Sequence, residues 1–131
     1  TMTDARHSST FTLEDGTLVP LGEAAGYVVR FSDAFALYIA GDTSLFGDMA
    51  LIGALWRPDA AILPIGDWFT MDPRQAAHAC KLLGVRSAIP CHYGTFPLLS
   101  GTPAELVRYL GPEELNLDVE VVTLSPGDSA S

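Results

Sequence analysis

The sequence of 131 residues predicts a single domain with a layered α/β fold, spanning residues 1–131. From residue 35 onward, apolar segments typical of strands alternate with segments of helical spacing, the order found in layered α/β proteins. Hydrophobic residues make up 48% of the chain, which indicates a packed core. One apolar segment stops abruptly at Gly41-Asp42, and such folds bind ligands in the crevice beyond the strand ends.

The N-terminal third is expected to contain extended segments joined by turns. Residues 2–6 have an extended pattern, whereas residues 11–23 are rich in turn-forming residues and are interpreted as a loop with one short strand at most. Residues 25–31 are rich in β-branched and aromatic side chains, which favour a strand. The turn at residues 32–33 joins this segment to the strand of residues 35–40, so the two are expected to form a hairpin.

The middle of the chain predicts a helix followed by a buried strand. Apolar residues recur at helical spacing over residues 45–55, and Thr43 or Ser44 is expected to cap the first turn. The proline of Arg57-Pro58 ends the helix. A fully apolar strand is then expected over residues 60–65.

The C-terminal part continues the same alternation of helices and strands. Asp72-Pro73 predicts a helix start, with aspartate as the cap and proline in the first turn, and Gly84 predicts its end. A strand, a helix and a last strand are expected over residues 85–91, 104–110 and 119–124.

Composition narrows the possible partners and location. The net charge of −9 disfavours binding to the phosphate backbone of nucleic acids. No apolar run approaches the length of a membrane helix and the first residues are polar, so we expect a cytoplasmic protein with no membrane partner. Cys80 and Cys91 form no metal-binding or disulfide pattern and are interpreted as small buried hydrophobic residues.

Polar groups that bind divalent cations follow several of the expected strands. These are His7, Asp42 and His92, with Asp67 at the end of a fourth strand. Two imidazoles and one carboxylate suit zinc, iron or manganese, and such an ion makes bound hydroxide available as a nucleophile. His78 lies within a helical segment and is interpreted as a surface or packing residue.

Each of these residues also has a structural explanation. Asp42 fits a helix cap, and a histidine at a strand end is commonly an ordinary hydrogen-bonding residue. Ser8 and Ser9 stand beside His7, but adjacent residues do not naturally face each other, and the chain contains no G-x-S-x-G motif. A serine hydrolase is therefore disfavoured.

Four segments resemble the metallo-β-lactamase superfamily, in particular its branch of metal-dependent hydrolases related to the ascorbate-phosphate lactonases. The segments are Ala5-Arg-His-Ser-Ser9, Ala40-Gly-Asp-Thr-Ser-Leu-Phe-Gly-Asp-Met49, Leu63-Pro-Ile-Gly-Asp-Trp-Phe-Thr-Met71 and Ile89-Pro-Cys-His-Tyr-Gly-Thr-Phe-Pro97. The resemblance implies an αββα sandwich with a two-metal site. It implies that His7 is a ligand of the first metal, Asp42 bridges both metals and His92 is a ligand of the second.

The resemblance also implies a substrate pocket beside the metals. It places six residues in or near that pocket, namely Asp67, Trp68, Phe69, Tyr93, Thr95 and Phe96. The implied reaction is hydrolysis of a small-molecule ester, lactone, amide or phosphoester by metal-bound hydroxide.

The chain departs from the family pattern because the HxHxDH motif, which supplies two ligands to each metal, is absent. The chain therefore resembles only the C-terminal half of the sandwich. We expect it to pair with the N-terminal half as a separate chain, to self-associate, or to be a fragment, since half-sandwich strands would leave an apolar face exposed. The alternatives are a non-catalytic half-domain with an incomplete metal site and an α/β interaction module without a metal.

Overall fold

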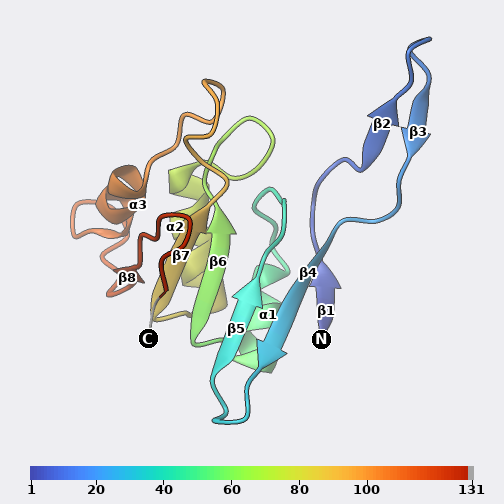
Figure 1. The fold of residues 1–131 in the computed structure, drawn as a ribbon. Helices are drawn as coiled ribbons and strands as arrows, with labels where there is room; N and C mark the ends of the chain where they lie inside the picture. The colour runs from blue at the N-terminus through green and yellow to red at the C-terminus, as the bar shows by residue number, and fades with distance from the viewer. Residues whose placement is uncertain (130–131) are drawn as a thin grey trace.

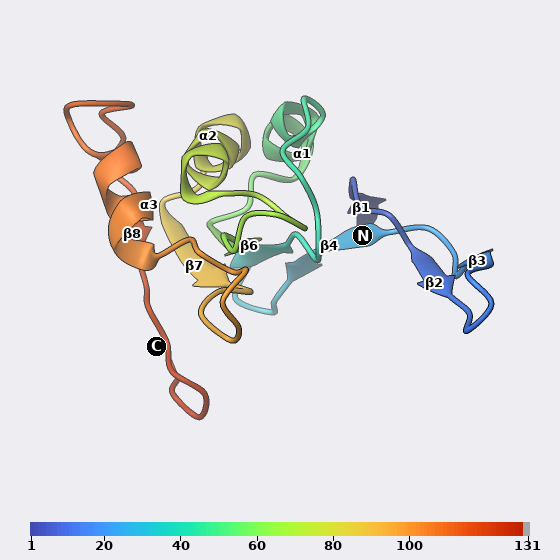
Figure 2. The same cartoon turned by 90° about the horizontal axis from the view of Figure 1, so that it is seen from above.

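The computed structural model describes residues 1–129, which form a six-stranded mixed sheet with three helices on one face (Figures 1 and 2). The order of the strands in the sheet is β1-β4-β5-β6-β7-β8. The strands are β1 (Met2–Asp4), β4 (Ala25–Arg30), β5 (Ala36–Ile39), β6 (Ala60–Pro64), β7 (Ser87–Cys91) and β8 (Glu120–Val121). The helices are α1 (Met49–Trp56), α2 (Pro73–Leu83) and α3 (Pro103–Leu110). The predicted α/β class is confirmed.

The sheet combines an antiparallel edge with a parallel part. β1 and β5 both pair antiparallel with β4, and β4 and β5 form the expected hairpin. β5, β6, β7 and β8 then run parallel, with one helix in each connection. The carboxyl ends of β5, β6 and β7 consequently meet at one edge of the sheet (Figure 1).

Local sequence signals explain the ends of α2 and α3. Asp72 caps α2 by accepting a hydrogen bond from the Gln75 backbone N–H (2.6 Å), and the Gln75 side chain accepts one from the Asp72 backbone N–H. Thr102 and Glu105 form the same reciprocal cap at α3. Gly84 ends α2 in the left-handed conformation that glycine adopts readily.

The core lies between the sheet and the helices. Alternate strand residues point toward the helices, so Tyr38 on β5 and Leu63 on β6 are fully buried. They meet apolar side chains from the helices, such as Met49, Leu83 and Leu106.

The opposite face of the sheet is apolar as well, but no helix of the described chain covers it. Six residues on β4 to β7 share this face by their register and are exposed or half-buried, namely Tyr27, Val29, Leu37, Ile39, Ile62 and Ile89. We call them the open face. Figure 2 shows the three helices on one side of the sheet and the C-terminal segment on the other.

Three expectations about individual elements were wrong. Residues 11–23 are not a loop with a single strand, because β2 (Thr10–Thr12) and β3 (Leu18–Pro20) pair as a hairpin that projects from the sheet (Figure 1). The helix expected over 45–55 begins only at Met49, and neither Thr43 nor Ser44 caps it, because the Thr43 hydroxyl accepts a bond from the Arg6 backbone (2.8 Å). The last strand covers only Glu120–Val121 of the expected 119–124.

No helix in the part of the chain that the structure describes has the length and apolar character needed to cross a bilayer.

Candidate functional site

Three of the predicted site residues follow neighbouring parallel strands at the same edge of the sheet. Asp42 follows β5, Asp67 follows β6 and His92 follows β7. Their strands are adjacent, with β6 in the middle, so the three residues leave the sheet side by side. This edge is the expected position for a ligand site in an open α/β sheet.

The structure brings Asp42 and His92 together. The His92 Nε2 atom lies 3.7 Å from Asp42 Oδ2, although the strands that carry them are separated by β6. The Asp42 side chain is 52% exposed and that of His92 is 28% exposed, so both are open to small molecules. One carboxylate oxygen and one imidazole nitrogen at this separation form an ion pair when His92 is protonated, or two ligands for one cation when it is neutral.

The backbone holds both residues in defined positions. Gly41, with φ of 65°, turns the chain out of β5 immediately before Asp42, and a Cβ there would lie 2.8 Å from the Ala25 carbonyl oxygen. His92 itself adopts a left-handed φ of 54°, which is disfavoured for a residue with a Cβ. Its Nδ1 is buried and has no hydrogen-bond partner among the described residues.

His7 lies on a segment that is bonded to the Asp42 loop. The Arg6 backbone N–H donates to Thr43 Oγ1 (2.8 Å), and the Ser44 N–H donates to the Arg6 carbonyl oxygen (2.9 Å). Within residues 1–129, however, no three His, Cys, Asp or Glu side chains converge as a metal-binding group. The donor set therefore fits a divalent ion only in part: Asp42 and His92 supply two ligands, and the role of His7 as a third stays a prediction.

The residues predicted to line a pocket lie on two loops at the same edge. Asp67 and Trp68 both have left-handed backbones, and the loop is closed by a bond from the Asp67 N–H to the Met71 carbonyl oxygen (3.0 Å). Trp68 is 70% and Phe69 is 50% exposed. The loop after β7 carries Tyr93, which is half-buried, and Thr95 and Phe96, which are exposed. The structure places all six near the strand ends, but their role in a pocket stays a prediction.

Cys91 is a site neighbour whose position the sequence analysis did not use. Burial, and to a smaller extent the negative charge of Asp42, raises the pKa of the Cys91 thiol to about 11. The thiol is therefore uncharged at neutral pH. Its place in the sequence, directly before His92 at the end of a strand, was the available signal.

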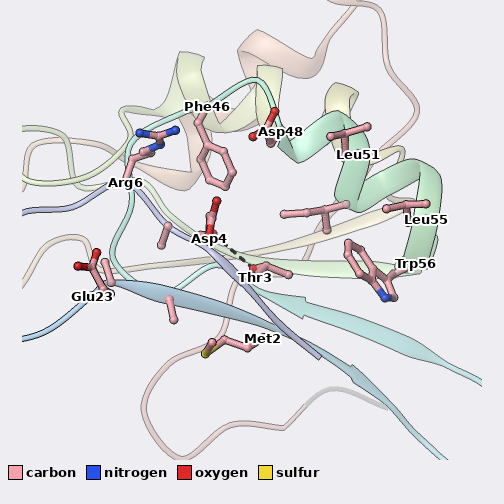
Figure 3. A pocket seen from close by; sticks show the side chains of 14 residues that line it. Met2, Thr3, Asp4, Arg6, Glu23, Phe46, Asp48, Leu51, Leu55 and Trp56 are labelled. Carbon is pink, nitrogen blue, oxygen red and sulfur yellow. Dashed lines mark hydrogen bonds between the residues drawn. The ribbon is translucent and has the colours of Figure 1, made fainter.

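A groove of about 690 Å³ lies elsewhere, between β1 and α1 (Figure 3). Its walls combine Leu51 and Leu55 of α1 with Phe46 and with charged side chains such as Asp4 and Asp48. None of the predicted site residues lines it.

Comparison with known proteins identifies relatives of the chain in sequence and in fold. A family model described as a beta-lactamase superfamily domain matches residues 1–93. A protein of Chloroflexus aurantiacus described as a metal-dependent hydrolase is 56% identical over all 131 residues, which cover 53% of that protein. The chain thus spans about half the length of this relative.

Two solved structures have a fold similar to that of this chain. A metallo hydrolase from the archaeon Ignicoccus hospitalis is 38% identical, with a TM-score of 0.79 over 98% of this chain and 50% of that protein. An isothiocyanate hydrolase from Delia radicum gut bacteria is 22% identical, with a TM-score of 0.71 over 99% of this chain and 53% of that protein, and shows similarity of fold alone.

Proposed function

Since the chain belongs to the β-lactamase superfamily, we propose that it forms part of a metal-dependent hydrolase in which Asp42 and His92 hold a divalent ion. The observation that carries this proposal is the 3.7 Å separation of Asp42 Oδ2 and His92 Nε2 across β6. A divalent ion supplies Lewis acidity and lowers the pKa of a bound water, which is the chemistry that hydrolysis of an unreactive bond requires.

Asp42 and His92 alone do not complete a metal site. Zinc usually takes four ligands, and manganese and iron take more. We propose that His7 contributes a third ligand, since the residue before it is hydrogen-bonded to the loop that carries Asp42. We propose that the other ligands come from the half of the fold that relatives possess beyond this chain. Zinc is the first candidate because of its preference for imidazole, with manganese and iron as alternatives.

The open face of the sheet is the proposed contact for the half of the relatives that this chain does not span. It presents aromatic and branched side chains such as Tyr27, Val29 and Ile62, and contiguous apolar surface of this kind typically marks an interaction site. We propose that a second layer covers it, contributed by a polypeptide equivalent to the remaining half of the relatives. Self-association of the chain through the same face is the competing outcome.

The proposed substrate is a small molecule with an ester, lactone, amide or phosphoester bond. The Asp42 side chain is half-exposed and is therefore accessible to a small molecule. We propose that Asp67, Trp68 and Phe69 on one loop shape one wall of the substrate pocket. Three residues of the next loop complete the proposed pocket, namely Tyr93, Thr95 and Phe96.

A non-catalytic half-domain is the second candidate. It is favoured by the observation that no group of three metal-binding side chains converges in residues 1–129. In this case the chain would bind an ion weakly through Asp42 and His92 and would hydrolyse nothing.

Metal analysis and turnover distinguish the two candidates. The chain is assayed alone and after assembly with the half of the Chloroflexus aurantiacus relative that it does not span, using zinc and generic ester and phosphodiester substrates. We expect tight zinc binding and turnover only in the assembly. Asp42→Asn should reduce zinc affinity by more than the roughly 10- to 100-fold that loss of a partner behind a ligand costs, since it removes the charge of a ligand itself. Asp48→Asn is the matched control, because Asp48 is exposed and its side chain caps nothing.

Two results would contradict the hydrolase proposal. One is an assembly that binds zinc stoichiometrically but turns over no substrate of either class, which would support the half-domain. The other is an Asp42→Asn variant that keeps wild-type zinc affinity and activity.

A further inference from the structure

Gly66 lies at the end of β6, between the strands that carry Asp42 and His92. Its backbone is not in the left-handed region, so conformational freedom does not explain a glycine there. Space does explain it, because a Cβ at this position would collide with the carbonyl oxygen of His92 and would lie 2.9 Å from Leu99 Cδ2 and 3.2 Å from His92 Nδ1. The backbone and ring of His92 thus pack directly on the glycine.

The conformation of His92 shows why this contact matters. Its φ of 54° is unusual for a residue with a Cβ, and such local strain persists only where the surrounding structure imposes it. The turn brings Nε2 toward Asp42, beyond β6, while Nδ1 faces Gly66 and is buried. Two features therefore fix the position of the His92 imidazole. One is the left-handed backbone of His92, and the other is the lack of a side chain at Gly66.

We propose that Gly66 is a positioning residue: its missing side chain lets His92 lie across the end of β6 and direct Nε2 at Asp42. The inference rests on the proposed metal site, in which His92 is a ligand. It adds that Nε2 is the coordinating nitrogen and that Nδ1 packs against Gly66.

The test measures zinc affinity in Gly66→Ala, using the assembled protein described for Asp42. Displacement of the ring should lower zinc affinity by about 10- to 100-fold, the usual effect of changing a residue that orients a ligand. Gly53→Ala is the matched control, because its Cβ would collide with the Leu83 carbonyl oxygen between α1 and α2, away from the site. It should lower the melting temperature and leave zinc affinity unchanged. Gly47→Ala, whose Cβ would meet nothing within 4 Å, should change neither.

A measurement on the wild-type protein covers the case in which Gly66→Ala does not fold. Nuclear Overhauser effects should connect the Gly66 α-protons to the His92 ring, and the ¹⁵N spectrum of the zinc-loaded protein should identify Nε2 as the bound nitrogen. Wild-type zinc affinity in Gly66→Ala, or coordination through Nδ1, would overturn the inference while leaving the metal site intact. Absence of zinc binding by wild-type protein would instead overturn the proposed function, and this inference with it.

Discussion

The two faces of the central sheet are built from similar side chains but have different surroundings. On β6, Leu63 points to the helices and is fully buried, whereas its neighbour Ile62 points to the open face and is half-buried. A strand that packs on one face only usually alternates apolar with polar residues. Here both faces are apolar, which is the pattern of a sheet that is buried on both sides. The helices α1, α2 and α3 cover one of these faces, and no helix of the described chain covers the other.

The largest effect is expected on the helix-covered face. Leu63→Ala should lower the free energy of unfolding by about 2–5 kcal/mol, because it leaves a cavity in a closely packed core. Urea denaturation followed by circular dichroism measures this loss. A loss below about 1 kcal/mol would mean that the helices do not pack against β6 as described.

A smaller effect is expected one residue away on the open face. Ile62→Ser should lower the free energy of unfolding of the isolated chain by about 1 kcal/mol or less, because the side chain is already half-exposed. The same change should weaken assembly with a covering layer, which sedimentation velocity measures. If Ile62→Ser destabilises the isolated chain as much as Leu63→Ala does, the open face is already covered by a second copy.

A pH-dependent effect is expected at the opposite end of β6. A hydrogen bond from the Ala36 backbone N–H, and then the Arg86 guanidinium, hold the pKa of Asp59 below its ordinary value of 3.8. The folded state therefore favours the carboxylate, so its contribution to stability is complete above that ordinary pKa and is lost as the pH falls through the lower folded pKa.

Asp59→Asn should accordingly flatten the acid limb of the stability curve. The effect should be modest, because Arg86 is 81% exposed and the ion pair is screened by water. Thermal melts between pH 2 and pH 6 (roughly one unit or more on either side of the carboxyl range) measure it. An unchanged acid limb in the Asp59→Asn variant would show that the Asp59 contacts do not persist in solution.

The smallest expected effect concerns thiol chemistry and leaves stability unchanged. Burial raises the pKa of the Cys80 thiol to about 12, so this residue on α2 should react negligibly with iodoacetamide at about pH 7.5 in the folded protein. Labelling after denaturation in urea provides the reference rate. Rapid labelling of native Cys80 would show that α2 separates readily from the sheet.

Much of the fold was predictable from local patterns. The β4–β5 hairpin and the start of α2 follow from β-branched runs and from Asp72-Pro73, signals that act over a few residues. The β2–β3 hairpin was missed, because its strands are three residues long and largely exposed, so burial leaves no pattern in them. The late start of α1 was missed because Thr43 bonds to Arg6, a contact between distant segments that spacing does not encode.

Sequence patterns proposed the members of the candidate site, whose roles stay predictions, but they did not indicate its geometry. Asp42 and His92 each follow an apolar strand segment, and this position predicted that they bind a divalent cation. Their meeting across β6 depends on the left-handed backbone of His92 and on the space above Gly66, and both arise from tertiary packing. The role expected for His7 depends on groups that do not converge within the described residues.

The Asp42–His92 pair has a consequence for cooperativity. The two residues enclose α1, β6, α2 and β7 in a single loop of the chain, so a ligand shared between them acts as a reversible cross-link around that whole unit. Ligand that binds only the folded form, in which the two side chains meet, stabilises that form by an amount that rises with the logarithm of the ligand concentration once the site is largely occupied. Occupancy of the pair and the folding of this unit are thereby coupled equilibria.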